Sequence, residues 1–160
     1  MRKLPNRLQC IAESIKNGSS VADIGTDHGL LPVYLVKTDK VRRIIASDIS
    51  EGSLYAARSL AAKHNLTDKI EIIRASGLSH LTATDVDTIV IAGVGGETII
   101  NILSDSPWFK EAILSGSLSL ILQPQTKINL LFEYLISCGL TVTKEITARD
   151  RGREYKILLI

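Results

Sequence analysis

The sequence predicts an α/β fold with a mostly parallel sheet that ends in an antiparallel hairpin. Short apolar runs alternate with helical patterns along most of the 160 residues, and this alternation is typical of a parallel sheet with helices on both faces. The last two apolar runs, 141–147 and 154–160, are joined only by residues 148–153. This connection is too short for a helical crossover, so we expect the two strands to pair antiparallel.

The first half of the chain predicts a leading helix followed by strand–helix units. Leu4, Leu8, Ile11 and Ile15 recur at helical spacing, and Asn17-Gly18 ends this helix. The other elements predicted here are strands at 21–24, 44–47 and 70–75, and helices at 30–36 and from Ser50 or Ser53 to His64.

The second half predicts two more parallel strands before the hairpin. The run 88–92 is nearly all β-branched and, like the third strand, is expected to be buried. The remaining elements are a strand at 118–122 and helices at 97–103, from Ser106-Pro107 in the N-cap and N1 positions, and at 129–137 with Gly139 as its stop. The result is a seven-stranded, Rossmann-like sheet of the class I methyltransferase kind, whereas two repeated mononucleotide-binding halves would indicate a dehydrogenase.

Composition limits the classes of function. The length and a hydrophobic content of 45% suit a single domain over residues 1–160, and a formal net charge of +2 gives little general attraction to nucleic acid. Cys10 and Cys138 are expected to be reduced thiols, and no metal site is expected because the histidines lack zinc-ligand spacing. No apolar run approaches the roughly 20 residues that cross a bilayer, so we expect a soluble, cytoplasmic protein without membrane contact.

The segment 21–29 predicts a site for a nucleotide-type cofactor. Its apolar run is interrupted at Gly25, where the absence of a side chain lets a ligand approach the backbone, and Gly29 can relax the turn into the next helix. Asp48 closes a second apolar run about twenty residues later, the interval at which an acidic residue binds ribose hydroxyls. The cofactor is therefore expected at the carboxyl ends of two neighbouring strands.

Two carboxylates favour S-adenosylmethionine over NAD. Asp27 takes the place of the middle glycine in the pattern G-x-G-x-x-G, and Asp23 lies just upstream. Both would repel a pyrophosphate but attract an ammonium and a sulfonium group. The alternative is that Asp27 only caps a helix and no ligand binds, a reading that the interval to Asp48 makes less favourable.

Four separated segments resemble the bacterial tRNA (adenine-22 N1)-methyltransferase family (TrmK). They are DIGTDHGLLP at 23–32, AGVGGE at 92–97, LILQPQ at 120–125 and EYKIL at 154–158. Members of this family usually continue into a C-terminal helical extension that is thought to bind tRNA. Since the chain stops at Ile160, we expect this extension to be absent and unaided tRNA binding to be weak.

The resemblance implies a role for each end of the expected cofactor site. The methionine end would contain Asp23, Gly25 and Asp27, the ribose end Asp48 and Ile49, and the adenine end Ser76, Gly77 and Leu78. The other expected cofactor-binding residues are Gly29, Ala92, Gly93 and Arg7, the last as a cap for the cofactor carboxylate. Ser76 stands where many relatives have an acidic residue, and Leu30 where they tend to have an aromatic one.

The loop after the fourth strand, at 93–96, favours a ring nitrogen as the methyl acceptor. It has no side chain that could bind an amino group or stack a base, whereas N1 of adenine has a free lone pair and needs only alignment and electrostatics. Asp27 is the expected catalytic residue because it could stabilise the cationic product. Glu97 is a second candidate, although interaction with a helix dipole explains it better.

Together these observations predict an S-adenosylmethionine-dependent methyltransferase acting on N1 of adenine 22 in tRNA. The alternatives are a methyltransferase of another RNA or a small molecule, and a non-catalytic cofactor-binding module. Two basic groups could contact phosphate. The first, Lys37, Lys40, Arg42 and Arg43, is better explained as solvated surface, and for Arg149, Arg151 and Arg153 the two explanations are equally good.

Overall fold

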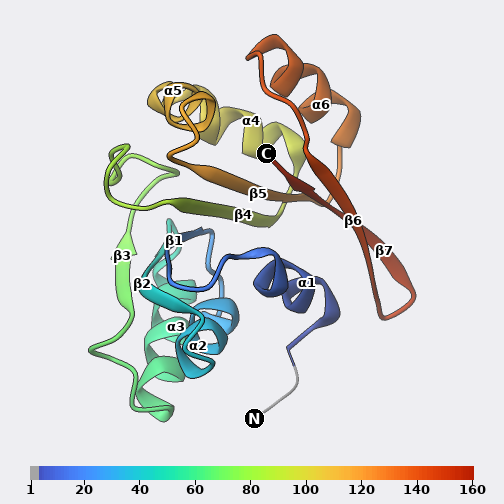
Figure 1. Cartoon of the computed structure of the whole chain (residues 1–160). Helices are drawn as coiled ribbons and strands as arrows, with labels where there is room; N and C mark the ends of the chain where they lie inside the picture. Colours follow the sequence, from blue (N-terminus) through green and yellow to red (C-terminus); the bar gives the residue numbers. More distant parts are fainter. Residues whose placement is uncertain (1–3) are drawn as a thin grey trace.

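A single seven-stranded sheet with helices on both faces makes up residues 4–160, the part of the chain that the computed structural model describes (Figure 1). The strands are β1 (Ser19–Ile24), β2 (Val41–Asp48), β3 (Glu71–Arg74), β4 (Thr88–Val94), β5 (Ser119–Pro124), β6 (Lys144–Asp150) and β7 (Arg153–Leu159). The helices are α1 (Asn6–Ser14), α2 (Leu30–Lys37), α3 (Glu51–Lys63), α4 (Gly96–Ser104), α5 (Trp108–Leu114) and α6 (Ile128–Ser137).

The sheet has the order β3-β2-β1-β4-β5-β7-β6. β1 pairs in parallel with both β2 and β4, so that Val21 lies beside Ile44 on one side and Thr88 on the other. β7 is antiparallel to both β5 and β6. The predicted Rossmann-like sheet with a terminal antiparallel hairpin is therefore confirmed.

Two apolar cores lie on opposite faces of the sheet. Side chains alternate along a strand, and in β4 the residues Ile89 and Ile91 face the core beneath α4, α5 and α6, while Val90 faces the core beneath α1, α2 and α3. Both helix layers are visible in Figure 1. Because β4 is covered on both faces, its apolar run is almost continuous, as parallel strands require.

β3 differs from the prediction of a buried strand. It is the edge strand of the sheet and pairs only with β2, and the side chains at both of its ends, Glu71 and Arg74, are exposed. Its isoleucines resemble those of β4 in sequence, but the position of a strand within the sheet depends on long-range pairing. The helix after Pro107 also differs slightly, because Pro107 rather than Ser106 is its N-cap.

The final hairpin is tighter than predicted. β6 extends to Asp150 and β7 begins at Arg153, so only Arg151 and Gly152 form the turn, with φ values of 49° and 77°. Two successive positive φ values are those of a type I′ turn, whose twist matches that of paired strands. Because β6 and the parallel strands are all antiparallel to β7, this turn extends from the edge of the sheet where the parallel strands end.

Candidate active site

A pocket of about 700 Å³ opens at the carboxyl ends of the parallel strands. This volume lies within the range of small-molecule sites. Most residues that the sequence predicted for the site line it: Arg7, Asp23, Gly25, Asp27, Asp48, Ile49, Ser76, Gly77, Leu78, Ala92 and Gly93. Residues 23–28 and 48–49 form what we call the β1–β2 side, and residues 93–96 and 124–127 belong to the β4–β5 side.

Asp48 is held in a fixed orientation on the β1–β2 side. Its Oδ2 accepts a hydrogen bond from the backbone N–H of Asp27 (3.1 Å), and its Oδ1 accepts one from the N–H of Ser50 (2.9 Å). Each carboxylate oxygen has a second lone pair, which stays available to a ligand. The Ser50 hydroxyl in turn caps α3 by accepting from the N–H of Ser53 (3.3 Å), so helix and carboxylate are positioned together.

Asp23 is a buried carboxyl group at the base of the same side. Its exposure is only 4%, and its Oδ2 accepts a hydrogen bond from the Thr26 hydroxyl at 2.8 Å. Burial raises the pKa of Asp23 to about 6, the nearby Asp48 and Asp27 charges add to the rise, and Thr26 and Arg7 oppose it. A cationic ligand group beside Asp23 would stabilise its ionised form.

Two glycines in the segment after β1 have different roles. Gly25 has φ of 74°, and a Cβ at this position would meet no atom within 4 Å, which leaves the backbone open to a ligand. Gly29 also has positive φ, but its Cβ would lie 2.9 Å from Cβ of Ala57 on α3. Gly29 does not line the pocket, and the need for glycine here is explained by the left-handed turn into α2, as predicted, and by close packing of α2 on α3, while contact of Gly29 with a cofactor stays a prediction.

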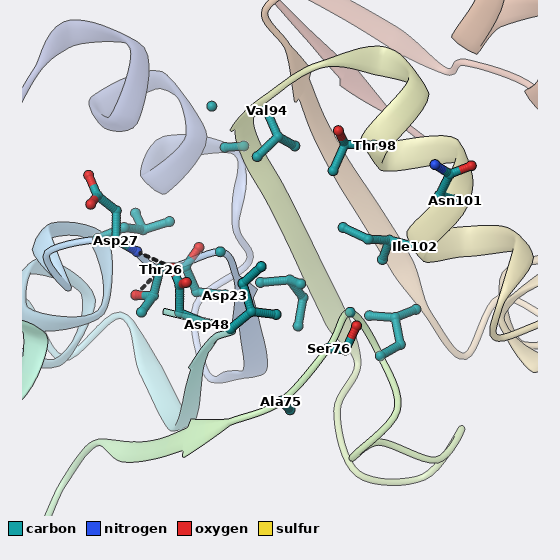
Figure 2. Close-up of a pocket in the computed structure, with 18 of the residues that line it drawn as sticks. Asp23, Thr26, Asp27, Asp48, Ala75, Ser76, Val94, Thr98, Asn101 and Ile102 are labelled. Atoms are coloured by element: carbon teal, nitrogen blue, oxygen red, sulfur yellow. Dashed lines mark hydrogen bonds between the residues drawn. The ribbon is translucent and has the colours of Figure 1, made fainter. Parts of the chain in front are cut away.

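Asp27 lies at the rim of the pocket. Its φ is 54°, its side chain is 71% exposed, and its carboxylate is 3.3 Å from Nδ1 of His28. In Figure 2 this carboxylate lies apart from those of Asp23 and Asp48. It can therefore act on a group at the mouth of the pocket, but its exposure means that solvent screens its charge.

The first turn of α1 connects the pocket with the arginine-rich hairpin. Asn6 donates a hydrogen bond to the carbonyl of Arg149 (2.9 Å), and the Arg7 guanidinium lies 5.9 Å from the centre of the Tyr155 ring. Figure 1 shows the hairpin beside α1. Of the two basic groups noted in the sequence, the hairpin arginines are thus the ones next to the pocket mouth.

The first basic group, which includes Arg42 and Arg43, lies near the start of β2, at the end of the sheet opposite to the pocket. Arg42 pairs with Asp87 at 3.1 Å, and Arg43 pairs with Glu71 at 2.9 Å. The parallel strands begin at this end, so these arginines lie far from the pocket along the strand direction. Their contacts explain them as structural surface charges.

One face of α4 forms a wall of the pocket that was not predicted from the sequence. Figure 2 shows Thr98, Asn101 and Ile102 across the pocket from the β1–β2 side, with Ser76 below them. A Cβ on Gly77 would lie 3.2 Å from Ile102, so α4 packs closely on the loop after β3. The spacing of three and four residues between the lining positions, continued by Asp105, is the signal that could have revealed one helix face.

The loop after β4 and the loop after β5 are joined by backbone hydrogen bonds. The N–H of Gln125 donates to the carbonyl of Val94 (2.9 Å), and the N–H of Gly96 donates to the carbonyl of Thr126 (2.8 Å). A Cβ on Gly96 would lie 2.6 Å from the carbonyl oxygen of Lys127, so only glycine fits there. Gln125 lines the pocket although it was not among the predicted site residues, whereas Glu97, the second catalytic candidate, does not line it.

Other kinds of site find no support in the described part of the chain. Within residues 4–160, no cluster of three or more His, Cys, Asp and Glu side chains could hold a metal ion, and no helix is long and apolar enough to cross a membrane. Cys10 and Cys138 are both half-buried free thiols.

Comparison with known proteins gives concordant matches. Residues 4–158 match the family described as a methyltransferase domain. The chain is 34% identical over 157 residues to the tRNA (adenine(22)-N(1))-methyltransferase of Bacillus subtilis, and this match covers 98% of the chain. It spans 64% of that relative's length, slightly less than two thirds.

Solved structures agree with the sequence matches. The B. subtilis m1A22 tRNA methyltransferase TrmK superimposes with a TM-score of 0.89 and 34% identity, over 99% of this chain and 66% of that one. A candidate tRNA (m1A22) methyltransferase of Streptococcus pneumoniae, in complex with S-adenosyl-L-methionine, gives a TM-score of 0.89 and 31% identity over 98% of this chain and 72% of that one.

Proposed function

Because the chain belongs to the tRNA (adenine(22)-N(1))-methyltransferase family of methyltransferase domains, we propose that it transfers a methyl group from S-adenosylmethionine to N1 of adenine 22 in tRNA. One observation carries the proposal beyond family membership. The pocket joins an acidic β1–β2 side to a loop after β4 that has no charged side chain. The first suits a cationic cofactor and the second suits close approach of a flat base.

The residues that line the pocket fit this cofactor. Asp48 would accept hydrogen bonds from the ribose hydroxyls with its remaining lone pairs, since its orientation is already set by two backbone N–H groups. Asp23 would face the ammonium and sulfonium end, and the open backbone at Gly25 gives that end room. Ile49, which is 66% exposed, would lie at the ribose end beside Asp48, and Ser76, Gly77 and Leu78 would lie at the adenine end. Bound there, the cofactor supplies an electrophilic methyl group on a positive sulfur.

The chain would promote transfer by alignment rather than by removing a proton. The N1 lone pair of adenine forms the new N–C bond as the C–S bond of the methyl donor breaks, and S-adenosylhomocysteine leaves. No base is needed, because neutral adenine has no proton on N1. The methylated ring becomes cationic, and Asp27 at the rim would stabilise that charge.

The arginine-rich hairpin is the proposed contact for the tRNA backbone. Among residues 4–160, Arg149 has an ion-pair partner, Glu154 at 2.8 Å, whereas neither Arg151 nor Arg153 has one. The hairpin adjoins the pocket mouth through Asn6 and Arg7. A phosphate bound here would hold the nucleic acid beside the site, and a tRNA substrate would place the activity in the cytoplasm.

Mapping the modified nucleotide tests the proposal. The protein is incubated with methyl-labelled S-adenosylmethionine and a tRNA transcript that contains adenine 22, and the digested nucleosides are separated. The expected product is 1-methyladenosine at position 22, and a matched transcript with guanine 22 serves as the control. Equal labelling of both transcripts would contradict the proposed target, and cofactor binding with no labelling at all would favour a non-catalytic binding module.

A further inference from the structure

Gln125 is a pocket residue with no part in the cofactor contacts described above. It is the first residue after β5 and its side chain is exposed at the pocket rim. Its backbone position is nevertheless well defined, because its N–H donates to the carbonyl of Val94 at 2.9 Å and the next residue, Thr126, accepts from the N–H of Gly96 at 2.8 Å. An exposed side chain on a backbone fixed in this way is suited to contact an incoming ligand.

The carboxamide of Gln125 lies beside Gly93, in the loop that the proposed target base would approach. A Cβ on Gly93 would be 3.8 Å from Nε2 of Gln125 and 3.7 Å from Nη1 of Arg7, so both side chains border the open backbone of Gly93. Arg7 can only donate hydrogen bonds, whereas a carboxamide both donates and accepts. Gln125 therefore has the chemistry to bind two different atoms of one base edge.

We propose that Gln125 binds the Hoogsteen edge of the target adenine, with Oε1 accepting from the N6 amino group and Nε2 donating to N7. This inference rests on the proposed function and adds the residue that selects the base. A glutamine carboxamide matches the N6 and N7 atoms of adenine in a bidentate pair. The same carboxamide on the other edge would occupy N1 itself, so only the Hoogsteen contact leaves the nucleophile free.

The contact would favour adenine over guanine, and it would be stronger in the transition state than in the bound substrate. Guanine has an oxygen in place of the N6 amino group, and that oxygen would face Oε1 of Gln125 as one acceptor against another. As N1 of adenine accepts the methyl group, the ring becomes positive and its N6–H becomes a stronger donor. The hydrogen bond to Oε1 is thus stronger in the transition state than in the bound substrate, which is the condition for faster transfer.

The test combines an atom deletion in the RNA with a side-chain deletion in the protein. Single-turnover methylation is measured on tRNA with adenine or 7-deazaadenine at position 22, for the parent chain and for Gln125→Ala. The parent is expected to be roughly 10-fold slower on 7-deazaadenine, within the range for one bidentate base contact. Gln125→Ala is expected to be slow on both RNAs and to show no further loss on 7-deazaadenine.

Two control measurements separate a base contact from a structural effect. Calorimetric titration should give the same S-adenosylmethionine affinity for Gln125→Ala as for the parent. Gln125→Glu keeps the N6 acceptor but sets a second oxygen against the N7 lone pair, so it should be no slower on 7-deazaadenine than on adenine, and on 7-deazaadenine it should be faster than Gln125→Ala. An equal cost of 7-deazaadenine in the parent and in Gln125→Ala would overturn the inference, as would no cost in the parent. If the parent fails to methylate N1 of unmodified adenine 22, the proposed function falls and the inference falls with it.

Discussion

The β1–β2 side of the pocket carries the carboxylates of Asp23, Asp27 and Asp48, whereas the loop at 93–96 that faces it carries no charged side chain. On the first side, side-chain oxygens are positioned by backbone N–H groups and by the Thr26 hydroxyl. On the second, glycines let two loops approach until their backbones bond directly. The charges of the β1–β2 side therefore favour a cationic ligand, whereas the lack of side chains in the loop at 93–96 lets a ligand approach the backbone closely.

The difference between the two sides explains how one pocket could hold a cofactor and still admit a large substrate. A cationic small molecule is recognised best by partly buried, oriented carboxylates. The proposed target nucleotide of a tRNA must instead leave its own stack and lie against a surface without obstructing side chains.

The largest effect is expected on the β4–β5 side, from Gly96→Ala. The added methyl group would lie 2.6 Å from the carbonyl oxygen of Lys127 and 2.9 Å from that of Thr126, both backbone atoms that cannot rotate away. We expect a loss of about 2–3 kcal/mol in the free energy of unfolding, measured by urea denaturation. Gly52→Ala is the control, since its Cβ would meet only Ser50 Oγ at 3.6 Å and is expected to be neutral or stabilising. Equal stability of both variants would contradict the packing argument.

Asp23→Asn probes the buried charge of the β1–β2 side. The pKa of Asp23 is raised from 3.8 to about 6, so the folded state retains its proton over a pH range in which the unfolded state has lost it. Stability of the parent should therefore fall as pH rises through this window and then level off. Asn does not titrate, so the stability of the variant relative to the parent should rise between about pH 4 and pH 6.5. A difference independent of pH would show that Asp23 is not destabilised by burial.

A smaller effect is expected from Asp27→Asn, which keeps the shape of the side chain and removes its charge. Because this carboxylate is 71% exposed, screening limits its effect on the cationic product. We expect a roughly 10-fold lower single-turnover rate and a smaller loss of cofactor affinity. A variant that methylates tRNA as fast as the parent would remove the electrostatic role from Asp27.

The smallest effect is expected outside the pocket, at the hairpin. Replacing Arg149, Arg151 and Arg153 with Gln should flatten the dependence of log tRNA affinity on log salt concentration, because binding through fewer phosphate contacts releases fewer counterions. The matched control replaces Arg42 and Arg43, which are paired with Asp87 and Glu71 at the opposite edge. An identical slope for the parent and the hairpin variant would identify the hairpin as a solvated turn.

The elements most predictable from the sequence are those whose pattern is local. The β-branched run of β4 and the interval between Gly25 and Asp48 required no knowledge of distant contacts. The edge position of β3 was missed because Ile72 and Ile73 resemble buried strand residues until pairing is known. The tight turn at Arg151-Gly152 was missed because a run of charged residues resembles a loop.

The predicted part of the pocket is likewise the part nearest in sequence to the strand ends. Thr98, Asn101 and Asp105 form a polar helix face, which in sequence looks like a solvated one, and only the packing of Ile102 on Gly77 turns it toward the pocket. Gln125 belongs to a segment that the resemblance marked, but its position beside Gly93 depends on hydrogen bonds between two loops. Gly29 has the predicted role in the turn into the next helix, since it is the N-cap of α2 with φ of 70°, but its close packing on Ala57 could not be seen in the sequence.

The most direct test of the division between the two sides is to measure S-adenosylmethionine affinity and single-turnover rate on the same two variants. Asp48→Ala should lose about 1.5–3 kcal/mol of cofactor binding, the range for hydrogen bonds to a charged group, while its rate at saturating cofactor stays within a few-fold of the parent. Gln125→Ala should retain the affinity and lose about 10-fold in rate. If both variants lose affinity and rate in the same proportion, the two sides do not have separate roles and the account is wrong.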